Sequence, residues 1–424
     1  MSRTLFILVS LVTLLHASPS SALAVARAEK IGINVRSNWT AETQITTDNI
    51  APYISAISQT RTGYVRLFIP WKFIQPEEKK DSPPAEWNWG KIDLMIEHIT
   101  AHGMEPLIVL SSQPAWATSA VTNAESDTYL PYKNPWNNFV TAMIQRYGYI
   151  QSGRQQVKYW EILNEPDAPG REYTSKQYGE FLKYTYPIIK SLDPQAKILN
   201  GGLTQISVRE DRADWLKQFL SYNHAEFARY FDYFSIHRYG DANTAGNIVT
   251  TTKGIFQETG VTKPIWVTET NIGSNFYKPQ IICNPEGEET KYLIFKTLFT
   301  NILQAGADKV FLLSAECSSW AGPGIIVRDS SSASSPNLVI IQNALTALTR
   351  AVTSFITPSS PAPNLADLTD EGDAQGDQVN QHDADQLKAD FGKTGAKDWI
   401  KADIHKDGKV DVFDYNVLVG AFGT

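Results

Sequence analysis

The sequence predicts an α/β fold, a (β/α)8 TIM barrel, followed by a small all-α module. Eight short apolar, β-branched runs alternate with stretches of helical period over about 325 residues, which is the number of units and the size of such a barrel. A Pro/Ser-rich segment then interrupts the pattern. Beyond it, five positions, Val379, Asp383, Leu387, Phe391 and Gly392, recur 31 residues later, which indicates a paired-helix repeat.

The apolar runs give the predicted strands of the barrel. They are residues 31–35, 64–69, 106–110, 157–163, 196–200, 233–237, 264–268 and 309–313. Helical period is clearest in residues 89–102, 137–147, 175–191, 290–305 and 337–351. The helices after the first and fifth strands are the least clear, so a doubly wound sheet is the alternative fold.

The chain begins with a predicted signal peptide over residues 1–24. Arg3 precedes an apolar run over residues 5–15, and Ala22-Leu23-Ala24 forms a cleavage site of small residues. The run is short for a bilayer of about 30 Å, although an uncleaved anchor is the alternative. No later stretch has the length of a membrane helix. We therefore expect a secreted, extracellular protein without a membrane span after cleavage.

Composition excludes several functional classes. The net charge of −7 argues against nucleic acid as a partner, because phosphate binding needs clustered Lys and Arg. Two cysteines exclude a disulfide scaffold and a Cys-rich zinc module, and the sequence leaves open whether Cys283 and Cys317 are bonded. The 11 Trp and 18 Tyr exceed what packing requires, which suggests that some line a ligand surface.

Two glutamates stand at predicted strand ends, where barrel enzymes keep their reacting groups. Glu165 follows the fourth strand directly after Asn164, and Glu269 follows the seventh. Two carboxyl groups across one barrel mouth suit cleavage of a glycosidic bond, since one protonates the leaving oxygen while the other faces the anomeric carbon as an anion. We expect Arg66 to keep Glu269 ionised and a dry pocket beside Trp160 to keep Glu165 protonated.

Other candidate site residues stand at the same end of the barrel. His237 and Tyr239 end the sixth strand. The second, third and eighth strands lead to rings that could hold a sugar face, Trp71, Trp116 and Trp320. Each of these residues has an alternative as a cap or a packing residue, and Glu161 is predicted to be structural because strand alternation points it differently from Asn164. Their common location favours a site.

Two segments resemble a known clan. Residues 160–166, WEILNEP, resemble the fourth-strand signature of the retaining (β/α)8 glycoside hydrolases, which include the cellulase-like family 5 and the xylosidase-like family 39. Residues 265–269, IWVTE, resemble the seventh-strand signature. The resemblance covers residues 29–355. Residues 110–116 lack the His that family 5 enzymes usually place after the third strand, and that stretch looks more like family 39.

This resemblance implies roles. Glu165 is implied to be the acid/base and Glu269 the nucleophile, with the carboxyl groups about 5–5.5 Å apart. Asn164 would bind the sugar 2-hydroxyl and Trp320 would floor the subsite of the cleaved sugar. The residues implied to position the carboxylates are Arg66, His237 and Tyr239. The implied substrate is a β-linked poly- or oligosaccharide, with no cofactor for catalysis.

The C-terminal part comprises a predicted linker, residues 356–364, and a module, residues 365–424. Residues 403–414 fit a 12-residue calcium loop with Gly408 at the sharp turn. The predicted ligands are Asp403, His405, Asp407, Lys409 (through its carbonyl), Asp411 and Asp414. His405 fits poorly, because calcium prefers oxygen.

This module resembles a dockerin, an EF-hand-like calcium-folded domain. The resemblance implies a structural Ca²⁺ and a cohesin-like partner, and it suggests attachment to a cell surface. A metal-free acidic loop is the alternative. At the level of the whole protein, the rival hypotheses are an inactive polysaccharide-binding barrel and a cell-surface scaffold or adhesion protein acting through its calcium module.

Overall fold

The computed structural model describes residues 26–356, apart from residues 36–46, 79–86, 150–156, 205–209, 273–286, 316, 318–323 and 330–336. The chain divides into two compact units, residues 1–355 and 356–424. The predicted signal peptide, the linker beyond residue 356 and the calcium module with all six of its predicted ligands lie outside the described residues.

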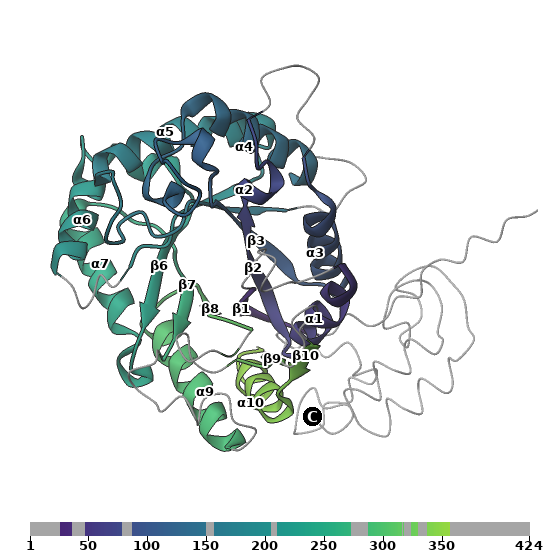
Figure 1. Ribbon diagram of the computed structural model, residues 1–424. Coiled ribbons are helices and arrows are strands. Elements are labelled where there is room, and N and C mark those ends of the chain that lie inside the picture. The colour runs from purple at the N-terminus through teal and green to yellow at the C-terminus, as the bar shows by residue number, and fades with distance from the viewer. Residues whose placement is uncertain are drawn as a thin grey trace, which may run out of the picture. The chain divides into compact units, whose positions relative to one another are not determined.

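Eight parallel strands form the barrel (Figure 1). Hydrogen bonding gives the order β5-β4-β3-β2-β1-β8-β7-β6, and parallel bridges from Leu199 to Tyr233 and from Leu203 to Ile236 join the two ends. The predicted barrel is confirmed, and a doubly wound sheet is excluded because the sheet closes on itself. The strands are β1 Ala28–Val35, β2 Thr62–Pro70, β3 Glu105–Ser111, β4 Tyr159–Ile162, β5 Lys197–Asn200, β6 Phe234–Tyr239, β7 Ile265–Asn271 and β8 Lys309–Leu312.

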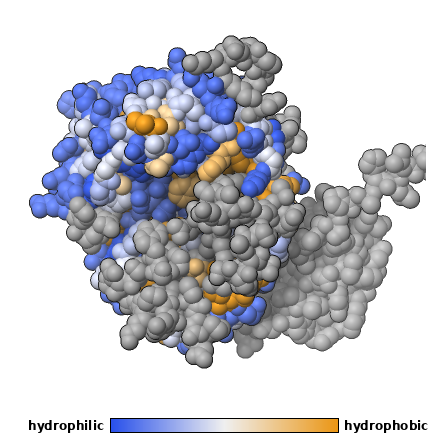
Figure 2. All heavy atoms as spheres, in the orientation of Figure 1, coloured by the Kyte–Doolittle hydropathy of each residue, from blue (hydrophilic) through white to orange (hydrophobic). Residues whose placement is uncertain are grey.

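Helices surround the strands (Figure 1). They are α1 Thr47–Gln59, the short α2 Trp71–Ile74, α3 Gly90–Ala101, α4 Lys133–Tyr147, α5 Ser175–Leu192, α6 Glu210–Ser221, α7 Asn247–Thr259, α9 Glu288–Gln304 and α10 Gln342–Thr353. The two helices that the sequence showed least clearly are α1 and α6. Figure 2 shows mostly hydrophilic side chains on the coloured part of this face, as expected of helices whose apolar sides pack on the barrel.

The predicted helix over residues 337–351 is partly wrong. Its first four residues form β10 Asn337–Ile340, which pairs antiparallel with β9 Ile326–Asp329, and α10 begins only at Gln342. The run Leu-Val-Ile in β10 is apolar and largely β-branched, which favours a strand where a partner strand is present.

The sequence left open whether the two cysteines are bonded. Cys317 is disulfide-bonded, and Cys283 lies outside the described residues.

Aromatic rings fill the barrel interior near the start of the strands. Tyr159, Trp266 and Phe311 are buried there, and Tyr64 packs against them. Gly32 makes room for this layer, since a Cβ at that position would lie 2.2 Å from the Phe311 ring. Because these rings pack together inside the barrel near the start of the strands, we expect the site at the C-terminal ends of the strands.

Strand alternation then sets the next layer. Tyr159 points inward, so Trp160 points outward and Glu161 inward again. Trp160 is fully buried on the outer side of the strand. The prediction that it forms a dry pocket with Glu165 inside the barrel mouth is therefore wrong.

Among the described residues, none of the helices is long and apolar enough to cross a membrane.

Candidate active site

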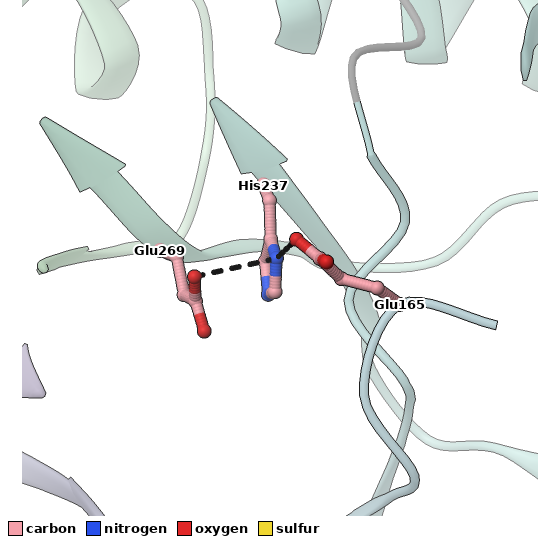
Figure 3. Close-up of side chains that lie close together, drawn as sticks. All are labelled: Glu165, His237 and Glu269. Atoms are coloured by element: carbon pink, nitrogen blue, oxygen red, sulfur yellow. Dashed lines mark hydrogen bonds and ion pairs between the residues drawn. The ribbon is translucent and has the colours of Figure 1, made fainter. Parts of the chain in front are cut away.

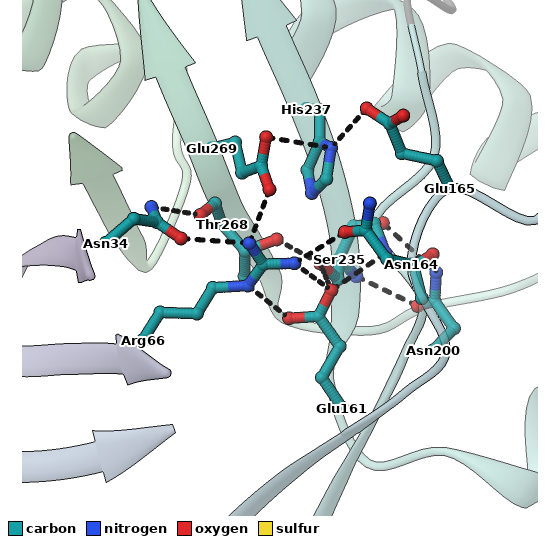
Figure 4. A network of polar contacts seen from close by, with 12 residues as sticks. Asn34, Arg66, Glu161, Asn164, Glu165, Asn200, Ser235, His237, Thr268 and Glu269 are labelled. Atoms are coloured by element: carbon teal, nitrogen blue, oxygen red, sulfur yellow. Dashed lines mark hydrogen bonds and ion pairs between the residues drawn. The ribbon is translucent and has the colours of Figure 1, made fainter. Parts of the chain in front are cut away.

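The guanidinium group of Arg66 lies at the centre of a polar layer inside the barrel (Figure 4). Its Nε and Nη2 donate to the two carboxylate oxygens of Glu161 at 2.9 and 2.8 Å. Its Nη1 donates to Glu269 at 2.6 Å and to Asn34 at 2.9 Å, and Nη2 also donates to Asn164 at 2.9 Å. Arg66 and Glu161 are completely buried. A buried charge of this kind is tolerated only when it is paired and hydrogen-bonded, as it is here.

A bulge in β7 places Glu269. Ile236 of β6 pairs with Val267, but the next residue, His237, pairs with Glu269, so Thr268 is an extra residue on β7. The pairing with β8 shifts between Val267 and Thr270 as well. A bulge changes the direction in which the following side chains point. Glu269 therefore faces the barrel mouth. Regular alternation from the inward Trp266, three residues earlier, would have pointed it outward.

Glu165 reaches the mouth through a kinked backbone. β4 ends at Ile162, and the backbone then turns through left-handed conformations at Leu163, with φ 62°, and at Glu165, with φ 49°. Left-handed backbone is uncommon for residues other than glycine and concentrates at functional sites. The Glu165 side chain is 27% exposed, whereas Glu269 is almost buried.

His237 of β6 lies between the two glutamates (Figure 3). Its Nδ1 is 2.9 Å from Oε1 of Glu165 and 3.6 Å from Oε2 of Glu269. One carboxylate oxygen of Glu165, one of Glu269 and a ring nitrogen of His237 all lie within 4.8 Å of one another. The Tyr239 hydroxyl donates to Oε2 of Glu269. The mouth thus holds two carboxyl groups at short separation, one exposed and one held by donors.

These contacts set the ionisation of the site. Burial alone would raise the pKa of Glu269, but His237 and Arg66, together with hydrogen bonds from Tyr239 and Arg66, outweigh it and hold the pKa below its usual value. Burial would lower the pKa of His237, yet Glu269 and the hydrogen bond with Glu165 raise it overall. Burial and Glu269 raise the pKa of Tyr239 far above its usual value, so its hydroxyl stays a donor.

The three clustered side chains also fit the donor set of a metal ion by distance. Their electrostatics fit it less well, because the fully buried Arg66 guanidinium lies 2.6 Å from the Glu269 carboxylate and already balances its charge. Tyr239 donates to the other oxygen of that carboxylate. The arrangement therefore suits an ionised carboxylate that faces substrate.

The structure brings together Arg66, Asn164, Glu165, His237, Tyr239 and Glu269 from the sequence-predicted set. Because Arg66 can only donate, the Asn164 amide presents its oxygen to Arg66 and its NH₂ group elsewhere. Glu161 pairs with Arg66, as expected of a structural residue, but it does not point away from Asn164 as predicted, because both accept from Nη2 of Arg66. Trp320 lies outside the described residues.

The two other predicted tryptophans differ in burial. Trp71 is fully buried and stacks on Phe139 with 4.7 Å between ring centroids. It cannot offer a face to a sugar, so its predicted role in substrate binding is wrong, and it is a packing residue. Trp116 is partly exposed and packs edge-to-face with Trp71, with 5.6 Å between ring centroids. Its indole N–H donates to the Gln75 carbonyl at 3.3 Å.

Sequence reasoning missed two residues of the polar layer. Asn34 at the end of β1 accepts from Arg66 and donates to the carbonyls of Thr268 and Leu312, at 2.9 and 3.2 Å. Gly202 donates its N–H to Glu161 at 2.9 Å and lies against the His237 ring. Asn34 could have been predicted as a site residue, because it is a polar residue at the end of a strand. Gly202 follows β5 but has no side chain, so its sequence position gave no such indication.

Comparisons with known proteins agree with this fold. The model of glycosyl hydrolases family 39 matches residues 74–276. No curated protein sequence matches the chain. A family 39 glycoside hydrolase from Bacteroides cellulosilyticus WH2 has 17% sequence identity and a TM-score of 0.52, and the match covers 77% of this chain and 64% of that enzyme. The chain therefore spans less than two thirds of the length of that enzyme.

Two further structures are similar. A family 39 β-xylosidase from Caulobacter crescentus has 17% identity and a TM-score of 0.54, with 77% of this chain and 71% of that one covered. An endo-β-1,4-mannanase from Thermotoga petrophila has 13% identity and a TM-score of 0.51, with 78% and 77% covered. At these identities the structures show a shared fold. Together the comparisons show that residues 74–276 are similar to glycosyl hydrolases family 39 and that the barrel has the fold of these enzymes.

Proposed function

We propose that the protein is a retaining β-glycosidase that works by double displacement. The observation that carries this proposal is the short separation of the glutamates, with carboxylate oxygens within 4.8 Å of each other. Retaining enzymes hold the two carboxyl groups about 5–5.5 Å apart, whereas inverting enzymes keep about 6.5–9.5 Å to admit a water molecule. The observed spacing supports direct attack on the sugar by one carboxylate.

In the first step, Glu269 attacks the anomeric carbon while Glu165 donates a proton to the departing oxygen, and the glycosidic bond breaks. In the second step, Glu165 takes a proton from water, the water oxygen attacks the same carbon, and the bond to Glu269 breaks. The lowered pKa of Glu269 favours the ionised nucleophile, and the greater exposure of Glu165 favours exchange of its proton with solvent.

The proposed substrate is a β-linked poly- or oligosaccharide. Two of the similar structures are a β-xylosidase and an endo-β-1,4-mannanase, and both names refer to β-linkages. The NH₂ group of Asn164, which faces away from Arg66, is proposed to bind the sugar 2-hydroxyl. Arg66, His237 and Tyr239 are proposed to position the carboxylates, and Trp116 and Trp320 to contact the sugar.

Glu269→Gln tests this function. We expect at least a thousandfold loss of kcat on β-linked polysaccharides and aryl β-glycosides, because the covalent nucleophile is removed. Glu258→Gln is the matched control, since Glu258 is exposed on α7 and forms a surface ion pair with Lys217 at 2.8 Å. Product of β configuration at first appearance, measured by NMR, would support retention. Unchanged hydrolysis in Glu269→Gln would overturn the assignment of the nucleophile. A wild type that binds a polysaccharide but hydrolyses none would instead favour the inactive, polysaccharide-binding barrel.

We also propose, from the sequence alone, that the protein is secreted and that its C-terminal unit binds Ca²⁺ through the six predicted ligands. A cohesin-like partner and attachment to a cell surface belong to the same proposal. Calorimetric titration of Ca²⁺ into the full chain and into Asp407→Ala tests the metal site, and we expect the variant to lose the binding heat. EDTA should leave hydrolysis unchanged, because the proposed reaction needs only the two glutamates.

A further inference from the structure

We infer that Arg171 is a positioning residue that holds the acid/base Glu165 in its working orientation through the protein backbone. The inference rests on the proposed function of Glu165. Arg171 lies in the loop between β4 and α5. Its described contacts are with backbone carbonyls, so it acts on the reaction through Glu165 and not by touching the reacting atoms.

All three guanidinium nitrogens of Arg171 donate to carbonyl oxygens. Nε donates to Glu165 at 3.0 Å, Nη2 donates to Asn164 at 2.9 Å, and Nη1 donates to Asp127 in the loop after β3. The neighbouring Glu172 N–H donates to the Thr128 carbonyl at 2.9 Å. The loop that carries the acid/base is therefore tied to a second loop of the barrel mouth.

The backbone at this point needs such support. Glu165 is left-handed, with φ 49°, and Leu163 two residues earlier has φ 62°. Non-glycine residues are strained in this region of backbone conformation and persist there only where their surroundings fix them. Relaxation of the 164–165 peptides would rotate the Glu165 carboxylate away from His237, whose Nδ1 is now 2.9 Å from Oε1.

Arginine suits this task better than lysine. Its planar fork presents several donors in fixed directions, so it can bond to two successive carbonyls and to a third one across the gap. A lysine ammonium is a single point of charge on a flexible stem and would hold fewer of the three in place. Arg171→Lys should therefore retain part of the function, and Arg171→Ala should lose most of it.

The test separates acid catalysis from general damage. Aryl β-glycosides of one sugar are compared, from a phenyl leaving group, which needs a proton, to a 2,4-dinitrophenyl leaving group, which does not. We measure kcat/KM, which reports the step that breaks the glycosidic bond. In Arg171→Ala we expect about a hundredfold loss or more on the phenyl glycoside and less than tenfold on the dinitrophenyl glycoside. Glu165→Gln should show the same signature more strongly.

Arg27→Ala is the matched control, because Arg27 also donates to two backbone carbonyls, those of Ser58 and Thr62, but precedes β1 at the opposite end of the barrel. It should leave the leaving-group dependence unchanged. Arg171→Lys should be intermediate, and added guanidinium ion should restore part of the activity of Arg171→Ala, whereas the same concentration of NaCl should not.

The outcomes distinguish this inference from the function on which it rests. A wild type that hydrolyses no β-glycoside overturns the proposed function and this inference with it. If the wild type is active and Glu165→Gln depends on the leaving group, equal losses on both glycosides in Arg171→Ala overturn the role of Arg171 alone. The same conclusion follows if Arg171→Lys, folded by circular dichroism, behaves as the wild type does with every leaving group.

Discussion

Arg66 donates two parallel hydrogen bonds to Glu161, 2.9 and 2.8 Å long, and neither side chain is exposed to solvent. This pairing uses one edge of the guanidinium and leaves Nη1 for the carboxylate of Glu269. Glu161 therefore fixes the plane of the group that holds the proposed nucleophile. An internal ion pair of this kind serves to orient neighbouring groups, since its net contribution to stability is small.

Glu161→Gln should strongly destabilise the protein. The amide leaves the charge of Arg66 partly unbalanced in the barrel interior and turns an NH₂ group toward a group that can only donate. We expect the free energy of unfolding to fall by about 3–5 kcal/mol, measured by urea denaturation. Glu289→Gln is the control, because Glu289 pairs with Arg350 on the surface, and it should cost less than about 1 kcal/mol. Equal costs would contradict the prediction.

Tyr239→Phe should move the acid limb of the activity profile. Its hydroxyl stabilises the ionised form of Glu269, so its loss raises the pKa of that carboxyl. Because the proposed reaction needs ionised Glu269, activity is lost at a higher pH as the solution is acidified. A hydrogen bond to a charged group is worth about 1.5–3 kcal/mol, so kcat/KM should also fall about ten- to hundredfold.

The measurement is kcat/KM against pH for the wild type, Tyr239→Phe and Tyr184→Phe. Tyr184 is on α5, and its hydroxyl donates to the Lys133 carbonyl at 3.2 Å, away from the barrel mouth. Its variant should keep the wild-type profile. An acid limb that stays in place or moves down in Tyr239→Phe would show that this hydroxyl does not control the ionisation of Glu269.

Gly202→Ala should damage the site through His237. A Cβ at this position would lie 2.0 Å from Nε2 of His237, and the ring would have to move. Misplacement of a catalytic group by about 1 Å can cost about a hundredfold in rate, and we expect a loss of that size in kcat. Gly254→Ala in α7 is the control, since its Cβ meets no atom within 4 Å and alanine favours a helix. Full activity in Gly202→Ala would mean that the His237 ring has room to shift.

Trp71→Ala should lower stability without changing substrate affinity. The ring is fully buried and parallel to Phe139 within 7°, so its removal leaves a large cavity. Such substitutions cost about 3–5 kcal/mol. Urea denaturation and KM, both measured on the folded variant, check this outcome. A tenfold rise in KM with unchanged stability would return Trp71 to the substrate surface.

Much of the barrel could be read from the sequence, for a physical reason. Strands of a parallel barrel are buried on both faces, so they appear as continuous apolar runs such as residues 106–110. The two glutamates proposed to react, Glu165 and Glu269, follow such runs, which is why they could be found in the sequence. Helix starts were less well predicted. The helix expected from residue 137 begins at Lys133, and the one expected from residue 337 begins at Gln342, because residues 337–340 pair with β9 as a strand.

Other features depend on contacts that no local pattern records. Trp71 and Trp116 look alike in the sequence, because each is a Trp that follows a strand. Trp71 is buried and Trp116 is partly exposed because different residues pack over the two rings. The left-handed turn at Glu165 is held by Arg171 and by the Ala168 N–H, and a Glu gives no sign of it in advance.

The extra residue in β7 has a consequence for how this site can change. Thr268 sets the phase of the strand, because in a strand of regular alternation the third residue after the inward Trp266 would point toward the outer helices. The position of the proposed nucleophile is thus specified by a count of residues as well as by a side chain. Engineers who graft this mouth onto another barrel must copy the insertion, because exchange of amino acids at matched strand positions would deliver the carboxylate to the wrong side of the wall.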